Sequence, residues 1–255
     1  MGVTKIEYLK KTWNPVEGCS PVSEGCANCW ARTIAERFHG GAFAPRIRRD
    51  KQGRDVFDEP RNWTFPQRVG VCFTGDLFHD DVETIVLVRI FDEIERSPQH
   101  TWLLLTKRPR RMLVWALKQY VPWSRQTIPG NIWWGFSAEN QTRFDERWAE
   151  MKWINYGVRA PPEGTRLEAR VWLSYEPALG PLVLPGSFLA RSPKPWVVCG
   201  AEQAAKARPM EPEWAEAVAV QCHDAGVPFY FKQASRKRRL PWCDRIKMLP
   251  EGWKP

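Results

Sequence analysis

The chain has 255 residues, of which 43% are hydrophobic and 26% are charged, and its formal net charge is +9. These values are typical of a soluble globular protein with one large core or two small ones. No run of eighteen apolar residues occurs, and the opening residues MGVTKIEYLKK contain no apolar segment, so neither a membrane span nor a secretion signal is indicated. We therefore expect a cytoplasmic protein with no membrane partner.

Short apolar runs alternate with stretches of helical spacing along the chain. The runs are rich in Val, Trp, Phe and Leu, as expected of strands that are buried on both faces. They cover 71–76, 101–109, 131–140, 171–177, 196–203 and 227–233, with a weaker strand at 12–14. The helical stretches cover 28–38, 81–97, 110–120, 141–155 and 211–226. This alternation predicts a parallel α/β fold of about six to seven βα units.

Charged or amide side chains follow the apolar core of six of these runs. They are Asp76, Lys107 with Arg108, Glu139 with Asn140, Glu176, Glu202 with Gln203, and Lys232 with Gln233. In a barrel of parallel strands these ends share the active-site face, whereas in an open doubly wound sheet they spread along a crevice. We favour a parallel (β/α) barrel or partial barrel over residues 1–233, with 234–255 as a basic C-terminal segment. The alternative is that strands simply end where polarity begins.

Three of the seven cysteines lie close together near the start of the chain, at Cys19, Cys26 and Cys29, with the spacing C-x6-C-x2-C. In a reducing cytosol such a cluster indicates metal or redox chemistry rather than disulfides. Three thiolates can hold three irons of a 4Fe-4S cluster and leave the fourth iron without a protein ligand. Three thiolates with His39 can instead form a closed tetrahedral zinc site. Spacing alone leaves both open.

The C-terminal part of the chain is strongly basic. Residues 232–247 contain seven Lys or Arg against one Asp, which predicts a polyanionic partner such as DNA or RNA. The cations that we expect to contact it are Lys232, Arg236, Lys237, Arg238 and Arg239. The alternative is a solvated tail that aids solubility.

Several segments carry a resemblance to a known family. They are TWNPVEGCSPVSEGCANCWA, GDLFHDDV, LLTKRPRRM, WWGFSAENQTRFDERW, YEPALGPL and ARPMEPEWAEAVAVQCHDAGVPFYFKQ, in order from Thr12 to about Gln233. Together they resemble the phage-type three-cysteine family of bacteriophages and bacteria, which is related to radical S-adenosylmethionine (SAM) enzymes. The resemblance implies a radical SAM-type barrel in a bacterial cytosol or a phage-infected host.

The same resemblance implies the cofactors, and the positions of the charged side chains at the strand ends suggest the roles. A 4Fe-4S cluster is expected on Cys19, Cys26 and Cys29, with SAM bound at the open iron and cleaved by one electron from a reducing donor. Cofactor binding is assigned to Asp76, Glu139, Asn140 and Glu202, with Asp76 meeting the methionine amine. Catalysis is assigned to Lys107, Glu176 and Lys232. For Asp76 the alternative is a cap on the following helix.

The chain departs from the family pattern at three places. The first cysteine gap is six residues where C-x3-C-x2-C is common, Asn28 stands where an aromatic residue is usual, and CGAEQ at 199–203 replaces Gly-Gly-Glu-Ser-Gly. The expected function is hydrogen abstraction from a nucleic-acid base or modified nucleotide, in DNA hypermodification or repair, as an isomerase, transferase or lyase. The alternatives are a non-catalytic zinc-stabilised nucleic-acid-binding protein and a partner protein that binds a cluster without cleaving SAM.

Overall fold

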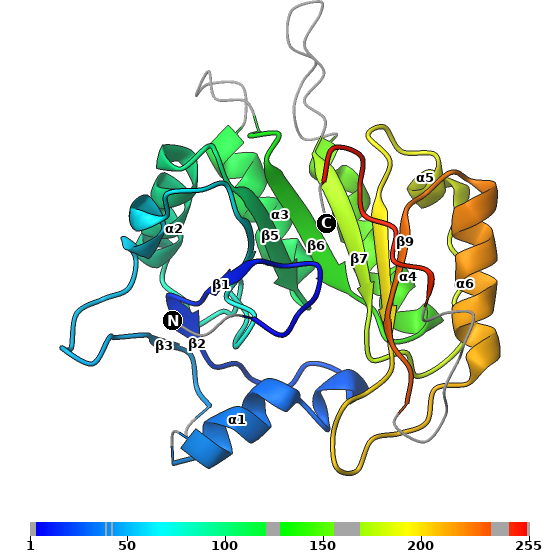
Figure 1. The fold of residues 1–255 in the computed structure, drawn as a ribbon, viewed down its shortest axis with the longest axis horizontal. Helices are drawn as coiled ribbons and strands as arrows, with labels where there is room; N and C mark the ends of the chain where they lie inside the picture. Colours follow the sequence, from blue (N-terminus) through cyan, green and yellow to red (C-terminus); the bar gives the residue numbers. More distant parts are fainter. Residues whose placement is uncertain are drawn as a thin grey trace, which may run out of the picture.

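The computed structural model describes residues 4–38, 40–41, 43–120, 128–155, 169–235 and 245–253. Seven parallel strands form one sheet in chain order, β1-β4-β5-β6-β7-β8-β9. The strands are β1 (Lys11–Trp13), β4 (Arg68–Val71), β5 (Thr101–Thr106), β6 (Ile132–Ser137), β7 (Arg170–Tyr175), β8 (Trp196–Gly200) and β9 (Phe229–Gln233). The sheet curls through 204° into a half-barrel, which confirms the predicted partial barrel (Figure 1).

Helices connect successive strands. They are α1 (Trp30–Phe38), α2 (Thr84–Arg96), α3 (Pro109–Tyr120), α4 (Gln141–Met151), α5 (Gly186–Leu189) and α6 (Pro212–Asp224). The helix α1 lies away from the outer helical layer, near the edge of the sheet where the cysteine loop is found (Figure 1). None of the described helices is long and apolar enough to cross a membrane.

The strands are buried on both faces, and each face has its own apolar layer. The layer between sheet and helices includes Phe91, Trp134 and Phe136. The concave face is filled by Trp133, Trp172 and Trp196, together with rings from the two ends of the chain: Tyr8, Tyr230 and Trp253. Gly135 of β6 makes room for this layer, because an added Cβ would lie 2.1 Å from Nε1 of Trp172. Many of the fifteen tryptophans therefore serve packing.

Several predicted boundaries differ from the structure, and one strand pair was not predicted. The run predicted at 71–76 is mostly a turn, because β4 begins at Arg68 and Cys72 follows it with φ of 55°. A charged residue can open this strand since Arg68 donates to the Tyr8 carbonyl at 2.9 Å. The helix predicted at 141–155 ends at Met151 and continues as a 3-10 turn over Lys152–Asn155. The unpredicted pair is β2 (Val16–Glu17), which precedes α1, and β3 (Arg46–Ile47), which follows it; the two strands are antiparallel.

Candidate functional site

The three clustered cysteines lie on the loop between the first strand and α1. Cys26 ends the 3-10 turn η1 (Glu24–Cys26), Cys29 immediately precedes α1, and the backbone N–H of Cys19 donates to the Phe43 carbonyl at 2.7 Å. All three are free, partly exposed thiols that line one cavity of about 190 Å³. The sequence cluster is therefore also a cluster in space.

The other walls of this cavity, which we call the cysteine pocket, come from the carboxyl ends of the strands. The predicted site residues that line it are Asp76, Lys107, Glu176 and Glu202, joined by Arg108. They follow β4, β5, β7 and β8. The parallel half-barrel thus brings four of the seven predicted non-cysteine site residues to one cavity with the thiols. Glu139, Asn140 and Lys232 do not line it.

Asp76 is held rigidly at the pocket wall. Its Oδ1 accepts hydrogen bonds from Thr106 Oγ1 at 2.7 Å and from the backbone N–H of Phe78 at 3.0 Å. Its Oδ2 accepts from the backbone N–H of Lys107 at 3.2 Å and from Nη1 of Arg108 at 3.1 Å. Because α2 begins only at Thr84, Asp76 does not cap that helix. The capping alternative is therefore wrong.

Arg108 connects Asp76 to the cysteine loop. Its Nη1 lies 3.4 Å from Sγ of Cys19, and its Nη2 donates to the Ser20 hydroxyl at 2.9 Å. The guanidinium is well shielded, with 10% of the side chain exposed. A fixed cation beside a thiol stabilises the thiolate, which is the form that binds metal.

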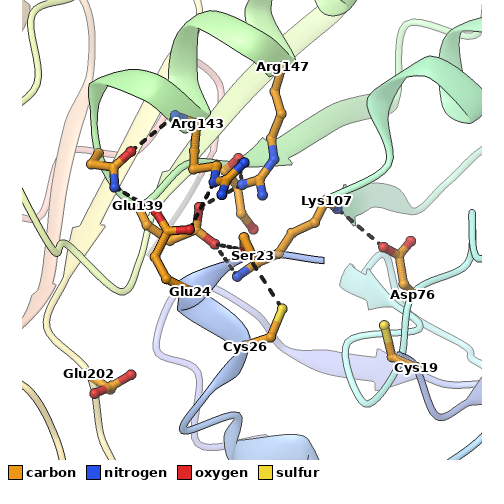
Figure 2. Close-up of polar contacts among 12 residues, drawn as sticks. Cys19, Ser23, Glu24, Cys26, Asp76, Lys107, Glu139, Arg143, Arg147 and Glu202 are labelled. Atoms are coloured by element: carbon orange, nitrogen blue, oxygen red, sulfur yellow. Dashed lines mark hydrogen bonds and ion pairs between the residues drawn. The ribbon is translucent and has the colours of Figure 1, made fainter. Parts of the chain in front are cut away.

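Glu139, at the end of β6, is fully buried and anchors the loop from the opposite side (Figure 2). Its Oε1 accepts from Ser23 Oγ at 2.7 Å and from Lys107 Nζ at 2.5 Å, and its Oε2 accepts from Nη1 of Arg147 at 2.8 Å. Gly25 packs so closely on this carboxylate that an added Cβ would lie 2.2 Å from Oε1. The loop therefore docks on Glu139 between the first two cysteines.

Asn140 extends this docking contact. Its Oδ1 caps α4 by accepting from the backbone N–H of Arg143 at 3.1 Å, while its Nδ2 donates to Oε1 of Glu24 at 2.7 Å. Arg143 Nε also donates to Oε2 of Glu24, at 2.9 Å (Figure 2). The six residues between Cys19 and Cys26 thus include the segment 23–25, which is fixed to β6 and α4. The long gap is an ordered attachment to the barrel.

Two further predicted site residues lie on the far side of the pocket. Glu176 accepts from Lys232 Nζ at 2.8 Å on both oxygens and from Gln233 Nε2 at 2.6 Å, which places Lys232 one contact away from the cavity. Glu202 accepts from Asn28 Nδ2 at 2.9 Å and from three nitrogens of Arg208. Asn28, which departs from the family pattern, thereby ties the cysteine loop to the loop after β8.

The thiols differ in their electrostatic surroundings. Burial and the nearby Asp76 raise the pKa of Cys19 to about 11, against the opposing effect of Arg108. Burial also acts on Cys26, but Lys107 and hydrogen bonds from the loop outweigh it and lower the pKa of that thiol. The buried thiols of Cys72 and Cys222 have pKa values raised by burial to about 12. The cation-flanked Cys26 is thus better prepared to ligate metal than either buried cysteine.

The donor set at the pocket consists of three cysteine thiols around one cavity. Among the described residues, no group of three His, Cys, Asp or Glu side chains is placed to hold a single metal ion. In a cubane cluster each cysteine binds a different iron, so three thiols that surround a shared cavity are compatible with that group. His39, the fourth ligand of the zinc alternative, lies outside the described residues.

Sequence reasoning missed three residues that position this site: Ser23, Arg143 and Arg147. Arg147 lies mid-helix, with 6% of its side chain exposed, and donates to both Glu139 and the Ser137 carbonyl. A buried arginine within an amphipathic helix carries no local motif. The basic residues Arg236, Lys237, Arg238 and Arg239 lie outside the described part of the chain.

One known family model matches nearly the whole chain. Residues 3–244 match the family described as protein of unknown function, DUF5131. The chain belongs to this family. No curated protein matches, and no solved structure matches. The family assignment is therefore consistent with the half-barrel but carries no named activity.

Proposed function

We propose that this DUF5131 protein is a radical SAM enzyme in which Cys19, Cys26 and Cys29 hold a 4Fe-4S cluster. The observation that supports this most directly is the position of the thiols. They line one cavity with charged side chains from four strand ends, at the edge of a parallel half-barrel where barrel enzymes carry their active sites. The cluster would supply one electron to cleave SAM and start hydrogen abstraction.

The chain's own residues divide the remaining work. Asp76 and Arg108 form a fixed charge pair at the pocket wall, suited to the amino and carboxylate groups of the methionine moiety of SAM. Glu202 offers a carboxylate to ribose hydroxyls from the opposite wall. Glu139 and Asn140, assigned above to the cofactor, contribute by holding the loop that carries the thiols.

Proton transfer falls to Glu176 and Lys232. Glu176 lines the pocket, and Lys232 donates to both of its carboxylate oxygens. This pair can deliver a proton to a substrate in the pocket or take one up from it. Glu176 faces the substrate, and Lys232 exchanges the proton with Glu176 from the side away from the cavity. Lys107, which faces Cys26 while bonded to Glu139, neutralises negative charge beside the cluster.

The substrate in this proposal is a nucleic-acid base or modified nucleotide, as in DNA hypermodification or repair. The net charge of +9 favours such a polyanionic substrate. A reducing protein is the expected electron donor.

One experiment tests the cluster and its chemistry. The protein is purified anaerobically and reconstituted with iron and sulfide, and its absorption spectrum is recorded. Reductant and SAM are then added and 5'-deoxyadenosine is measured. We expect a brown protein that forms 5'-deoxyadenosine, loss of iron in Cys26→Ala, and retention of iron in the matched control Cys222→Ala, whose thiol is buried on α6.

The other outcomes separate the alternatives. Zinc bound without iron, with His39 required for binding, would replace the proposal with the zinc-stabilised nucleic-acid-binding protein. An iron-sulfur cluster without SAM cleavage would point to a partner protein that keeps the fold. Equal iron loss in Cys26→Ala and Cys222→Ala would show that the loop is not the cluster site.

A further inference from the structure

The cysteine pocket is small. It measures about 190 Å³, whereas pockets for drug-sized ligands hold roughly 300–1,000 Å³. If the proposed function is right, the cluster lies against the thiols here, and SAM and a substrate extend beyond this space. The surface that adjoins the pocket is therefore the place to look for the substrate.

A second, more open groove of about 540 Å³ adjoins the pocket and shares Val22, Lys107 and Arg108 with it. We call it the arginine groove. Its other lining residues are Asp80, Pro109, Arg110, Arg111, Val114, Arg143, Glu146, Arg147 and Glu150. Apart from Asp80, which lies before α2, they come from α3 and from α4, which packs against α3. A ligand in this groove reaches the pocket past the shared residues.

Most cations of the groove already have carboxylate partners. Lys107 and Arg147 share Glu139, and Arg143 pairs with Glu24 (Figure 2). Arg108 pairs with Asp76, and Arg143 also pairs with the exposed Glu146. Local charge is therefore nearly balanced. We therefore expect an anionic ligand to be held in the groove by directed hydrogen bonds from guanidinium groups, more than by long-range attraction to a net positive charge.

One arginine of the groove presents free donors. Arg110 is exposed and has no ionic partner among the described residues. The next residue, Arg111, donates to the Val82 carbonyl, and its Nη1 has no hydrogen-bond partner in the described part of the chain but is buried away from the groove surface. An exposed guanidinium with unused N–H groups matches the bidentate geometry of phosphate oxygens.

Exposed apolar side chains lie in the groove and at the pocket wall. Val22 is 41% exposed at the junction of pocket and groove, and Val114 is 43% exposed in the groove. Trp30, which is 45% exposed, lines the pocket and not the groove. In single-stranded nucleic acid, bases stack on rings while the backbone meets arginine, so the pocket wall and the groove offer the two kinds of contact on adjoining surfaces.

We propose that the arginine groove binds the phosphate backbone of a single-stranded nucleic-acid substrate, with Arg110 contacting phosphate, while one unpaired base reaches the mouth of the cysteine pocket past Val22 and Trp30. This inference rests on the proposed function for its geometry. A base within a duplex cannot reach an enclosed reaction centre without leaving the stack, so an unpaired strand is the matching form.

The test measures binding of a fluorescein-labelled single-stranded oligonucleotide by anisotropy, for the full chain reconstituted with iron and sulfide. Arg110→Glu is expected to weaken binding about tenfold and to lower the salt slope by roughly one. The matched control is Lys118→Glu, an exposed cation on the same helix outside the groove, which changes net charge equally and is expected to stay within about twofold. Arg110→Lys keeps the positive charge but loses the two-pronged hydrogen bonding of the guanidinium, so it separates hydrogen bonding from simple charge attraction. It is expected to bind about threefold more weakly than the unaltered chain.

Equal losses of oligonucleotide affinity in Arg110→Glu and Lys118→Glu would contradict the proposal that the groove is the binding site. Binding that depends only on Arg236, Lys237, Arg238 and Arg239 would also contradict the proposal, as would equally tight binding of a mononucleotide.

A second pair of variants tests the stacking contact with the same probe. Trp30 and Trp153 are both exposed, but only Trp30 lines the pocket, so Trp30→Ala is compared with Trp153→Ala. Iron content is measured for each variant. A chain that loads no cluster but binds the strand through Arg110 refutes the proposed function and leaves the groove standing.

Discussion

At the scale of single residues, the buried carboxylate of Glu139 holds the cysteine loop in place, because it accepts a hydrogen bond from Ser23 and packs against Gly25. It is fully buried between Lys107 and Arg147, whose side chains are 19% and 6% exposed. These two charges compensate its burial, since a lone buried charge is strongly unfavourable. Burial opposes ionisation of Glu139, yet both cations act against it, and the pKa of this carboxyl lies below its usual value.

Glu139→Gln is therefore expected to lower the free energy of unfolding by about 3 kcal/mol, because it leaves two shielded cations without their counter-charge. Urea denaturation followed by circular dichroism measures the change. The control is Glu146→Gln, whose side chain is 54% exposed and pairs with Arg143 at the surface, with an expected change within about 0.5 kcal/mol. Similar losses in the two variants would contradict the role given to Glu139.

His100 is a buried titratable residue away from the cysteine pocket. Its Nδ1 accepts from the backbone N–H of Gln67 at 3.2 Å, and its ring packs between Trp63 and Trp102. Burial, helped by the charge of Lys11, lowers the pKa of His100, although a hydrogen bond with the Pro60 carbonyl opposes this. The folded state therefore favours the neutral ring.

The sign of the pH effect follows from that preference. A histidine whose folded pKa lies below its unfolded value of about 6.5 stabilises the fold fully above that pH and loses the contribution as pH falls toward the folded pKa. We expect the melting temperature to drop between pH 7 and pH 5, and to drop less in His100→Gln, which keeps an acceptor for Gln67. Identical pH profiles for both proteins would exclude His100 as a source of the effect. The pKa of His79 is also lowered by burial, so part of the drop should remain.

At the scale of elements, the periodicity of the sequence predicted most strands and helices to within a few residues. β5, β6, β8 and β9 fall inside predicted runs, and β7 begins one residue before its run, because strands buried on both faces are continuously apolar. β4 was displaced since it opens with Arg68, whose charge is satisfied by the distant Tyr8 carbonyl. Such a partner, sixty residues away, leaves no local pattern.

The start of α4 shows how one residue serves two elements. Asn140 caps the helix through Oδ1 and holds Glu24 of the cysteine loop through Nδ2. The sequence predicted a polar residue at this strand end, but its attachment to the loop depends on the fold. A substitution that keeps the cap and removes the donor separates the two functions.

Asn140→Asp retains a capping oxygen but places a carboxylate against Glu24, whereas Asn140→Ala removes both contacts. We expect Asn140→Ala to lower the free energy of unfolding by about 1 kcal/mol and Asn140→Asp to lower it by less, because the cap persists. Both should increase hydrogen exchange in the cysteine loop, measured by mass spectrometry. Unchanged exchange at 19–29 in Asn140→Asp would show that the Glu24 contact does not hold the loop.

At the scale of the whole molecule, the half-barrel topology explains why four distant strand ends could be predicted to meet. Parallel strands in chain order place every carboxyl end at one edge, so Asp76, Lys107, Glu176 and Glu202 reach one pocket. The closure of the concave face was not predictable, because it depends on both chain ends. The backbone N–H of Phe231 donates to Ile246 at 2.8 Å, and the described residues after 244 run back along β9.

Trp253 tests how much the concave layer depends on this returning segment. Its ring lies edge-on to Trp133 and Trp196, with centroids 5.3 Å and 5.2 Å away. Removing a partly buried ring with two aromatic partners should cost about 2 kcal/mol, less than the roughly 3–5 kcal/mol of a fully buried one. Trp253→Ala is therefore expected to shift the urea midpoint downward, while Phe65→Ala, 72% exposed, should leave it nearly unchanged. A midpoint that does not move in Trp253→Ala would mean that the half-barrel holds its aromatic interior without the ring of Trp253.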